Sequence, residues 1–273
     1  MPKSKNNRKG KKRVGDKRPV PRSGRNEGPV DYRTTEPLVG NTSAPTQGIP
    51  QRQCKFLDRI ATLPDIFTPE ECNQIINTAL NDWDEVESKI QRDKGTEIKQ
   101  NFEEDHDYRN TTLFMPKPLK LQDGANKPKL GAFEDWLFGK IMDAINAFNN
   151  QELGWHFDIH GMAEAPNVMR YQAPDINKHG KPGKYDWHMD VGPGPIPSMR
   201  KLSYSVLLNP GEYEGGELAF HIGRSMDPYP GQTEKKSIGS MVLFPSYCVH
   251  RVQPMTKGTR YAVVGWAHGN SFR

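Results

Sequence analysis

Apolar residues recur every three or four positions from Cys72 to Trp83, as they do along the buried face of a helix. Thr68, Pro69 and Glu71 stand just before this stripe or at its start. Thr68 can cap a helix, Pro69 suits the first helical position, and Glu71 completes a capping box. The pattern therefore predicts a helix after Thr68 that buries Cys72, Ile75, Ile76, Ala79, Leu80 and Trp83.

A second helical stripe is predicted from Gly131 to Phe148, with its inward residues again three or four positions apart. These residues are Phe133, Leu137, Ile141, Ala144, Ile145 and Phe148. Residues 84–108, between the two helices, are polar and are expected to form a mobile loop. The segment from Arg109 to Met115 is expected to form a short strand.

From Trp155 onward the pattern changes to an alternation of apolar and polar positions, which is typical of strands. About eight short strands separated by Gly and Pro are typical of a sandwich or jelly roll. The expected fold class is mainly β with α, in which the two N-terminal helices pack on one outer face. The strands are predicted at 155–160, 166–172, 184–190, 201–209, 217–222, 238–244, 248–253 and 259–267.

Charge separates the first 50 of the 273 residues from the rest of the chain. Residues 1–50 hold 12 Lys and Arg but only four Asp and Glu, whereas residues 51–273 hold 26 basic and 29 acidic residues. With few apolar residues to bury, 1–50 is expected to be a disordered basic tail. It is either a solvated, solubilising tail or an arm for an acidic partner such as RNA or the ribosome. The expected domains are this tail, a helical support region at 51–154 and a β core at 155–273.

Several classes of protein are excluded. No apolar run approaches the ~18 residues of a membrane span, and the charged N-terminus lacks the apolar region of a secretory signal. The three cysteines form no CxxC pair, which argues against a disulfide framework and for a reducing compartment. A cytoplasmic protein is expected.

The sharpest candidate chemistry is carried by His188, Asp190 and His250. Residues i and i+2 of a strand point to the same face, so His188 and Asp190 can offer an imidazole and a carboxylate to one ion. His250 lies on a later strand of the same predicted barrel. Two His and one carboxylate on one face of an iron leave three positions open, as in the facial triad of non-haem Fe(II) oxygenases. The three are therefore predicted to be metal ligands and catalytic residues.

Arg260 is a further candidate residue of this site, and it requires an anionic partner. If 249–253 and 259–267 form a hairpin that turns near Met255, His250 and Arg260 lie opposite each other and share a face. A buried guanidinium near a metal needs a carboxylate partner. A dicarboxylate that chelates iron at one end and pairs with Arg260 at the other fits this arrangement, as 2-oxoglutarate does.

Taken together, these segments resemble the prolyl 4-hydroxylase-type 2-oxoglutarate/Fe(II) oxygenases, and most closely the bacterial and phage branch of PKHD-type hydroxylases. The resemblance covers about 155–270 strongly, 56–154 weakly and 1–50 not at all. The residues that carry it are Tyr171, Tyr185 to Asp190, Leu207 to Asn209, Gly215 to Leu218, Val249 to Val252 and Arg260 to Trp266.

The resemblance implies a double-stranded β-helix, iron and 2-oxoglutarate as cofactors, O2 as cosubstrate and ascorbate as a supporting reductant. By position, Arg260 anchors 2-oxoglutarate, Tyr171 hydrogen-bonds it, and Arg109 occupies a substrate-side strand position or is a surface residue. Prolyl hydroxylases often have Lys where this chain has Arg260, which favours the PKHD branch over a claim about proline. The implied reaction is hydroxylation of a protein or peptide side chain, with prolyl as one option and with release of succinate and CO2.

Alternatives remain at the level of function. The same scaffold serves small-molecule and nucleobase hydroxylases, and a non-catalytic metal-binding barrel with an RNA-binding tail is the rival from another class. A second alternation, His156-Phe157-Asp158-Ile159-His160, offers a rival metal site, but an exposed strand face explains it more simply. No metal role is predicted for the remaining histidines, His106, His179, His221 and His268.

Overall fold

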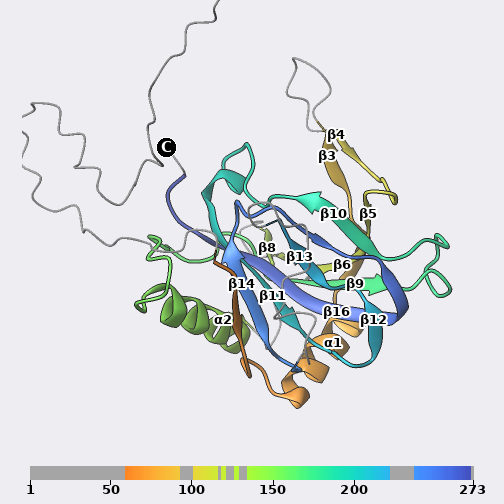
Figure 1. The fold of residues 1–273 in the computed structure, drawn as a ribbon, viewed down its shortest axis with the longest axis horizontal. Helices are drawn as coiled ribbons and strands as arrows, with labels where there is room; N and C mark the ends of the chain where they lie inside the picture. Colours follow the sequence, from red (N-terminus) through yellow and green to blue (C-terminus); the bar gives the residue numbers. More distant parts are fainter. Residues whose placement is uncertain are drawn as a thin grey trace, which may run out of the picture. The chain divides into compact units, whose positions relative to one another are not determined.

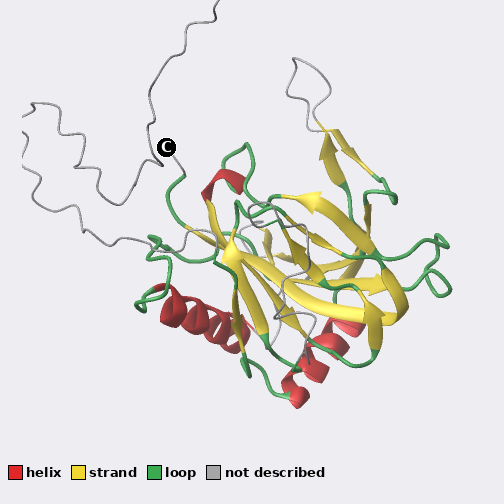
Figure 2. Ribbon diagram, viewed as in Figure 1, coloured by secondary structure: helices red, strands yellow, loops and turns green. Residues whose placement is uncertain are grey.

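The computed structural model describes residues 59–92, 101–115, 118–120, 126–128, 134–221 and 237–271. Within these ranges the chain is mainly β, with two α-helices, as expected (Figures 1 and 2). The helices are α1 (Pro69–Asp82) and α2 (Glu134–Asn149), and a short 3-10 helix spans Pro197–Met199. Neither α-helix is long and apolar enough to cross a membrane.

The larger sheet is antiparallel throughout and follows the order β1-β14-β11-β16-β9-β6-β2, with β12 also paired to β16. Chain neighbours are rarely sheet neighbours, so the sheet is assembled from distant segments. Its strands are β1 (Ala61–Leu63), β2 (Asp84–Glu87), β6 (Thr112–Met115), β9 (Asn167–Gln172), β11 (Arg200–Leu207), β12 (Tyr213–Gly215), β14 (Met241–Pro245) and β16 (Met255–His268).

The smaller sheet has the order β13-β15-β10-β5 and is also antiparallel. Its strands are β5 (Arg109–Asn110), β10 (Lys184–His188), β13 (Leu218–Phe220) and β15 (His250–Val252). Two separate hairpins complete the described strands: β3 (Ile90–Arg92) with β4 (Asn101–Glu103), and β7 (Pro118–Lys120) with β8 (Asn126–Pro128).

Two apolar cores position these layers. One joins both α-helices to the outer face of the larger sheet, so α1 and α2 cover one side of it, as predicted (Figure 1). The other core draws residues from both sheets, which therefore pack face to face. The two facing antiparallel sheets are consistent with the double-stranded β-helix expected from the resemblance. Side chains shared by the second core include Met169, Tyr171, Leu218, Phe220, Phe244 and Val252.

The first helix forms for the local reasons that its sequence predicts. Thr68 Oγ1 accepts a hydrogen bond from the Glu71 backbone at 3.3 Å, and a Glu71 carboxylate oxygen accepts one from the Thr68 backbone at 2.9 Å. Cys72, Ile75 and Ala79 are buried along the helix, as expected. Leu80 is the exception: its side chain is 43% exposed, because it lies beyond the edge of the buried stripe.

The second helix also follows its predicted stripe. Leu137, Ile141, Ile145 and Phe148 are buried against the larger sheet. The predicted start at 131–133, including Phe133, lies outside the described residues.

Three segments differ from expectation. The predicted strand from Arg109 to Met115 is divided into β5 and β6, which belong to different sheets. The polar stretch 84–108 is not a single loop, because β2 pairs with β6 and β3 pairs with β4; residues 93–100 lie outside the description. The predicted strand 155–160 is irregular. His156 has a φ of 54°, in the left-handed region, and the Asn149 side chain bonds both backbone polar groups of Phe157, which would otherwise serve a strand ladder.

Candidate active site

The imidazoles of His188 and His250 are brought together by strand pairing. His188 ends β10, His250 begins β15, and the two are direct partners in the antiparallel register. Their ring centroids lie 4.2 Å apart. Asp190 follows the end of β10 and is held by its backbone N–H, which donates to the Ser246 carbonyl at 2.9 Å. Strand alternation therefore does not align His188 with Asp190 as predicted, yet the two side chains still converge.

The donor atoms face one another at a spacing that an ion can bridge. Nε2 of His188 lies 3.6 Å from one oxygen of Asp190, and Nε2 of His250 lies 3.6 Å from the other. Donors bound to one octahedral ion at about 2.1 Å lie about 3 Å apart, so only a small contraction is needed. The structure thus brings together all three residues predicted as ligands.

Both histidines have their second ring nitrogen occupied. Nδ1 of His188 lies 2.7 Å from the Asp186 carbonyl, and Nδ1 of His250 lies 2.9 Å from the Cys248 carbonyl. A carbonyl only accepts, so each Nδ1 carries a proton, and Nε2 of each ring faces Asp190. This is the usual way in which a protein fixes the tautomer and orientation of a metal-binding histidine.

Burial and charge favour the states that bind a cation. Burial first, and then the neighbouring His250, lower the pKa of His188 to about 3, so this imidazole stays neutral at ordinary pH. Burial alone would raise the pKa of the Asp190 carboxyl. The imidazoles of His250 and His188, with hydrogen bonds from Ser203 and Trp266, outweigh burial and lower that pKa below its ordinary value. The site therefore combines neutral imidazole with carboxylate, the donor set that suits iron.

The three donors line a pocket that is formed between the two sheets. Arg260 lines the same pocket and is only 1% exposed. Its Nη2 donates to Ser205 Oγ at 3.3 Å, while Nε and Nη1 are buried without a hydrogen-bond partner among the described residues. Two unsatisfied donors on a buried cation fit the carboxylate of a bound dicarboxylate.

The route by which Arg260 reaches the pocket differs from the predicted hairpin. β15 and β16 belong to different sheets, and Arg260 pairs with Tyr171 of β9, whereas His250 pairs with His188 and Phe220. Residues 255–258, expected to turn, continue as β16 because β12 pairs with them. Arg260 and His250 thus share a pocket because the sheets face each other.

Tyr171 and Arg109 both line this pocket. Tyr171 is 3% exposed, and the Arg260 guanidinium lies 5.1 Å from its ring centroid. The Arg109 guanidinium lies 4.4 Å from the ring of Tyr185, which in turn stacks on His188 with centroids 3.5 Å apart. A register irregularity between Tyr185 and His188 brings these i and i+3 side chains into contact.

Sequence reasoning missed the support beneath Asp190. Arg200 donates to the Asp190 carbonyl and forms a bidentate pair with Glu164, at 2.6 and 2.5 Å. Its guanidinium also lies 3.5 Å from the Trp266 ring centroid, and His268 approaches Glu164 to 3.1 Å. Glu164 and Arg200 are far in the sequence from each other and from Trp266 and His268, so the sequence holds no local signal for the network.

The rival alternation does not assemble a site. His160 lies 3.2 Å from Asp158, but His156 does not join them. Among the described residues, two groups of three donors come within 4.8 Å of one another: His188 with Asp190 and His250, and Glu87 with His106 and His179.

Residues 174–268 match the family model described as the 2OG-Fe(II) oxygenase superfamily. The matched segment includes His188, Asp190, His250 and Arg260, whereas Arg109 and Tyr171 precede it. The resemblance predicted from the sequence is therefore confirmed, and this family implies Fe(II) and 2-oxoglutarate.

Over part of its length the chain is similar to PKHD-type hydroxylases. One from Hyphomonas neptunium is 34% identical over 112 residues, covering 39% of this chain and 48% of the relative. One from Xylella fastidiosa is 34% identical over 161 residues, covering 55% and 63%. The chain spans about half the length of the curated relatives that it matches.

Two solved structures are also similar. A prolyl-4-hydroxylase from Pseudomonas putida aligns with a TM-score of 0.49 and 13% identity over 78% of this chain and 94% of its own. A prolyl hydroxylase from Trichoplax adhaerens, in complex with a hypoxia inducible factor oxygen degradation domain peptide fragment, aligns with a TM-score of 0.49 and 16% identity over 77% and 84%.

Proposed function

We propose that this protein is an Fe(II)- and 2-oxoglutarate-dependent dioxygenase that hydroxylates a side chain of a protein or peptide. The observation that carries the proposal is the pairing of two features in one pocket: the converging donors of His188, Asp190 and His250, and the buried Arg260 with two unsatisfied nitrogens. These features fit a metal at one end and a carboxylate at the other.

Each residue of the pocket has a separate role in this proposal. His188 and His250 hold iron through Nε2, while their Nδ1 protons stay on backbone carbonyls. Asp190 supplies the carboxylate ligand, and Arg260 binds the distal carboxylate of 2-oxoglutarate, with Tyr171 beside it. Iron, 2-oxoglutarate and O2 together supply the oxidising power, with succinate and CO2 as co-products and ascorbate as a supporting reductant. The apolar pocket wall excludes water from the reacting atoms.

A protein or peptide substrate is supported by the surface beside Asp190. Met189 is 54% exposed and Ile196 is 41% exposed, so apolar side chains flank the segment that follows the ligand strand. Arg109 lies at the same pocket from the edge strand β5 and is the proposed substrate-side residue. Whether the target is a prolyl residue is part of the test. The basic segment 1–50 lies outside the described residues, so an RNA or ribosome partner stays a prediction from charge alone.

The test is turnover of 2-oxoglutarate to succinate by the purified full chain with Fe(II), followed by mass spectrometry of a treated lysate. We expect succinate formation, and peptides that gain the mass of one oxygen atom only when 2-oxoglutarate is present. His250→Ala should abolish both signals while circular dichroism shows the fold retained. Equal succinate formation by wild type and His250→Ala would contradict the proposal; oxygen gain on small molecules alone would move the substrate class to the alternative.

A further inference from the structure

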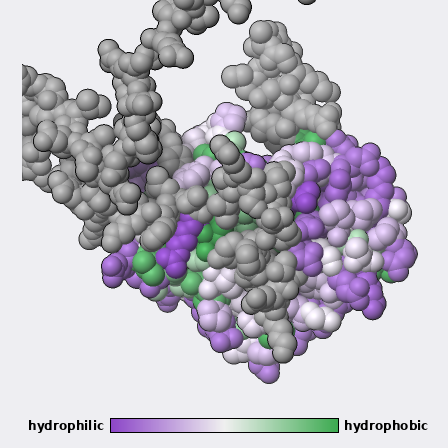
Figure 3. All heavy atoms as spheres, viewed as in Figure 1, coloured by the Kyte–Doolittle hydropathy of each residue, from purple (hydrophilic) through white to green (hydrophobic). Residues whose placement is uncertain are grey.

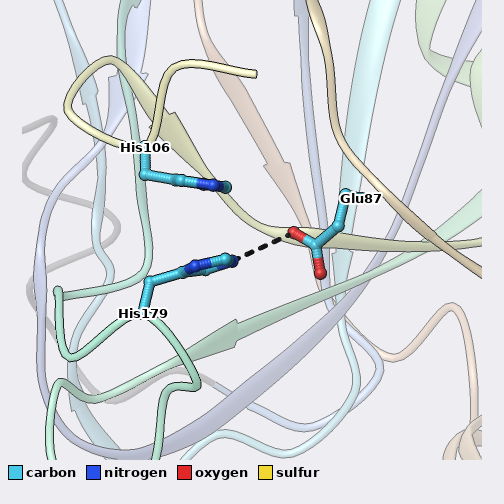
Figure 4. A group of neighbouring side chains, drawn as sticks. All are labelled: Glu87, His106 and His179. Carbon is cyan, nitrogen blue, oxygen red and sulfur yellow. Dashed lines mark ion pairs between the residues drawn. The ribbon is translucent and has the colours of Figure 1, made fainter.

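Three side chains outside the proposed active site converge at the ends of separate segments (Figure 4). Glu87 ends β2, His106 lies in the turn before β5, and His179 lies between β9 and β10. One donor atom from each lies within 4.8 Å of the other two. Both imidazoles point toward the Glu87 carboxylate from the same side, and Nε2 of His179 lies 3.6 Å from one of its oxygens (Figure 4).

These segments are held together by an ion pair, a hydrogen bond and ring stacking. Lys181 pairs with Asp107 at 2.6 Å, which joins the turn of His106 to the segment of His179. The Asn110 side chain donates to the carbonyl of Lys181 at 2.9 Å. The rings of His106 and His179 stack with centroids 3.6 Å apart. The donors are therefore brought close before any ion binds, which lowers the entropy cost of binding one.

The polar atoms at the centre of this cluster are incompletely satisfied. Nε2 of His179 is buried and has no hydrogen-bond partner among the described residues, and 3.6 Å to Glu87 is too long for a hydrogen bond. The other Glu87 oxygen forms an ion pair with Lys178, whose side chain is 59% exposed. Glu104 is a further nearby carboxylate, 3.9 Å from Nε2 of His106. A cation is thus already drawn to Glu87, in the form of a flexible ammonium.

We propose that Glu87, His106 and His179 bind a divalent transition metal of the zinc class, at a second site separate from the proposed iron centre. Two imidazoles and one carboxylate suit zinc, and nitrogen donors disfavour magnesium or calcium. Donors on one tetrahedral zinc lie about 3.4 Å apart. The cluster reaches that spacing when the stacked imidazoles splay and Lys178 swings into solvent. Water takes the fourth position.

The site is accessible to a hydrated ion and linked to the ligand strand. Glu87 and His179 line a polar surface pocket, and the segment between β9 and β10 lies in a hydrophilic part of the surface in Figure 3. The turn of His106 continues into Tyr108, whose hydroxyl donates to the Trp187 carbonyl at 2.7 Å and whose carbonyl accepts from Asp186 at 2.8 Å. A bound metal therefore fastens the turn that abuts β10, which is a structural role and does not depend on the proposed function.

Zinc titration of the chelator-treated full chain tests the site, with a chromophoric chelator as competitor. To separate the two centres, the background variant carries His188→Ala and His250→Ala. We expect wild type to bind two equivalents and the background variant to keep one. Adding His106→Ala and His179→Ala should lower the affinity of the remaining equivalent at least 100-fold, whereas adding His221→Ala, an exposed histidine outside the cluster, should leave it unchanged.

Lys178→Ala, in the otherwise unaltered protein, supplies a second measurement that does not depend on the background variant folding. Removal of the competing ammonium should tighten zinc binding at this site several-fold. If the cluster binds no metal, neither wild type nor Lys178→Ala takes up a second equivalent of zinc. The inference is overturned if the background variant binds no zinc while folded, or if loss of His106 and His179 leaves the affinity unchanged. If the background variant unfolds, an unchanged second-site affinity in Lys178→Ala overturns it instead.

Discussion

Arg200 donates a hydrogen bond from Nη1 to the backbone carbonyl of Asp190 at 3.0 Å. The same guanidinium is clamped by Glu164 through two further bonds and lies over the ring of Trp266. Trp266 itself donates to the Asp190 carboxylate. One cation therefore positions both the backbone and a side-chain partner of the proposed carboxylate ligand.

Arg200→Lys should weaken Fe(II) binding because an ammonium cannot make the forked contacts and stack on Trp266 at once. Outer-shell partners of metal ligands are typically worth about 10- to 100-fold in affinity, so a loss of about tenfold is expected. The measurement is succinate formation against Fe(II) concentration at saturating 2-oxoglutarate. Lys257→Ala breaks only an exposed ion pair with Glu214 and should behave as wild type. An unchanged Fe(II) dependence in Arg200→Lys would show that Asp190 is positioned without it.

The buried, neutral state of His188 predicts how stability depends on pH in the metal-free protein. The pKa of this imidazole is lowered from 6.5 to about 3 in the folded chain. Between pH 3 and pH 6.5 the unfolded chain therefore binds more protons at His188 than the folded chain does. Stability contributed by the neutral ring is therefore present above pH 6.5 and is lost as the pH falls toward 3. The lowered pKa of the Asp190 carboxyl likewise reduces stability as the pH falls below 3.8.

Melting temperatures of wild type and His188→Gln between pH 7 and 4, with a chelator present, check this expectation. The variant should lose less stability over the acidic part of the range, because it has no imidazole to protonate at this position. His221→Gln removes an exposed imidazole and should keep the wild-type slope. Parallel curves for wild type and His188→Gln would mean that the His188 imidazole titrates alike in the folded and unfolded chains.

Arg260 is expected to set the affinity for 2-oxoglutarate. Arg260→Ala removes the two buried donors that lack partners, and charge-assisted bonds of this kind are worth roughly 1.5–3 kcal/mol each. Loss of even one such bond should raise the apparent KM for 2-oxoglutarate roughly 10- to 100-fold, and loss of both should raise it further. Arg260→Lys should lose less because it keeps the charge. Fe(II) binding without 2-oxoglutarate should change little in both variants. Equal affinity in wild type and Arg260→Ala would place the carboxylate anchor elsewhere.

The parts of the structure that were predictable are those determined by nearby residues. Thr68 and Glu71 cap α1 through reciprocal bonds three positions apart, so the sequence carries the whole motif. The proposed ligands were predictable for a related reason: His188 and Asp190 are two positions apart, and His250 was expected on a later strand of the same barrel. The strand geometry predicted for His188 and Asp190 was wrong, because β10 ends before Asp190. A backbone hydrogen bond to Ser246 holds Asp190 in place instead.

The parts that were not predictable depend on which distant strands pair. Pro254 to Gly258 has turn-forming residues, and Gly258 does adopt a φ of +71°. Pairing with Tyr213 and Glu214 nevertheless keeps 257–258 within β16, so the predicted hairpin does not form. The Glu87 cluster is a second case: its three residues are far apart in the sequence, and only the pairing of β2 with β6 and of β5 with β10 brings their segments together.

Gly216 is expected to be required for the placement of Arg260. Its φ is +69°, and a Cβ at this position would lie 2.5 Å from the Met255 sulfur and 3.1 Å from Cδ of Arg260. Gly216→Ala should therefore destabilise the fold and also push the guanidinium away from the pocket, raising the KM for 2-oxoglutarate several-fold. Gly211→Ala is the matched control, because Gly211 also has a positive φ, +95°, but nothing lies within 4 Å of its Cβ position. We expect Gly211→Ala to lower the melting temperature without changing KM, because the backbone strain is common to both variants and the contact with Arg260 is not. If the two variants shift KM equally, backbone strain rather than the contact with Arg260 accounts for the effect.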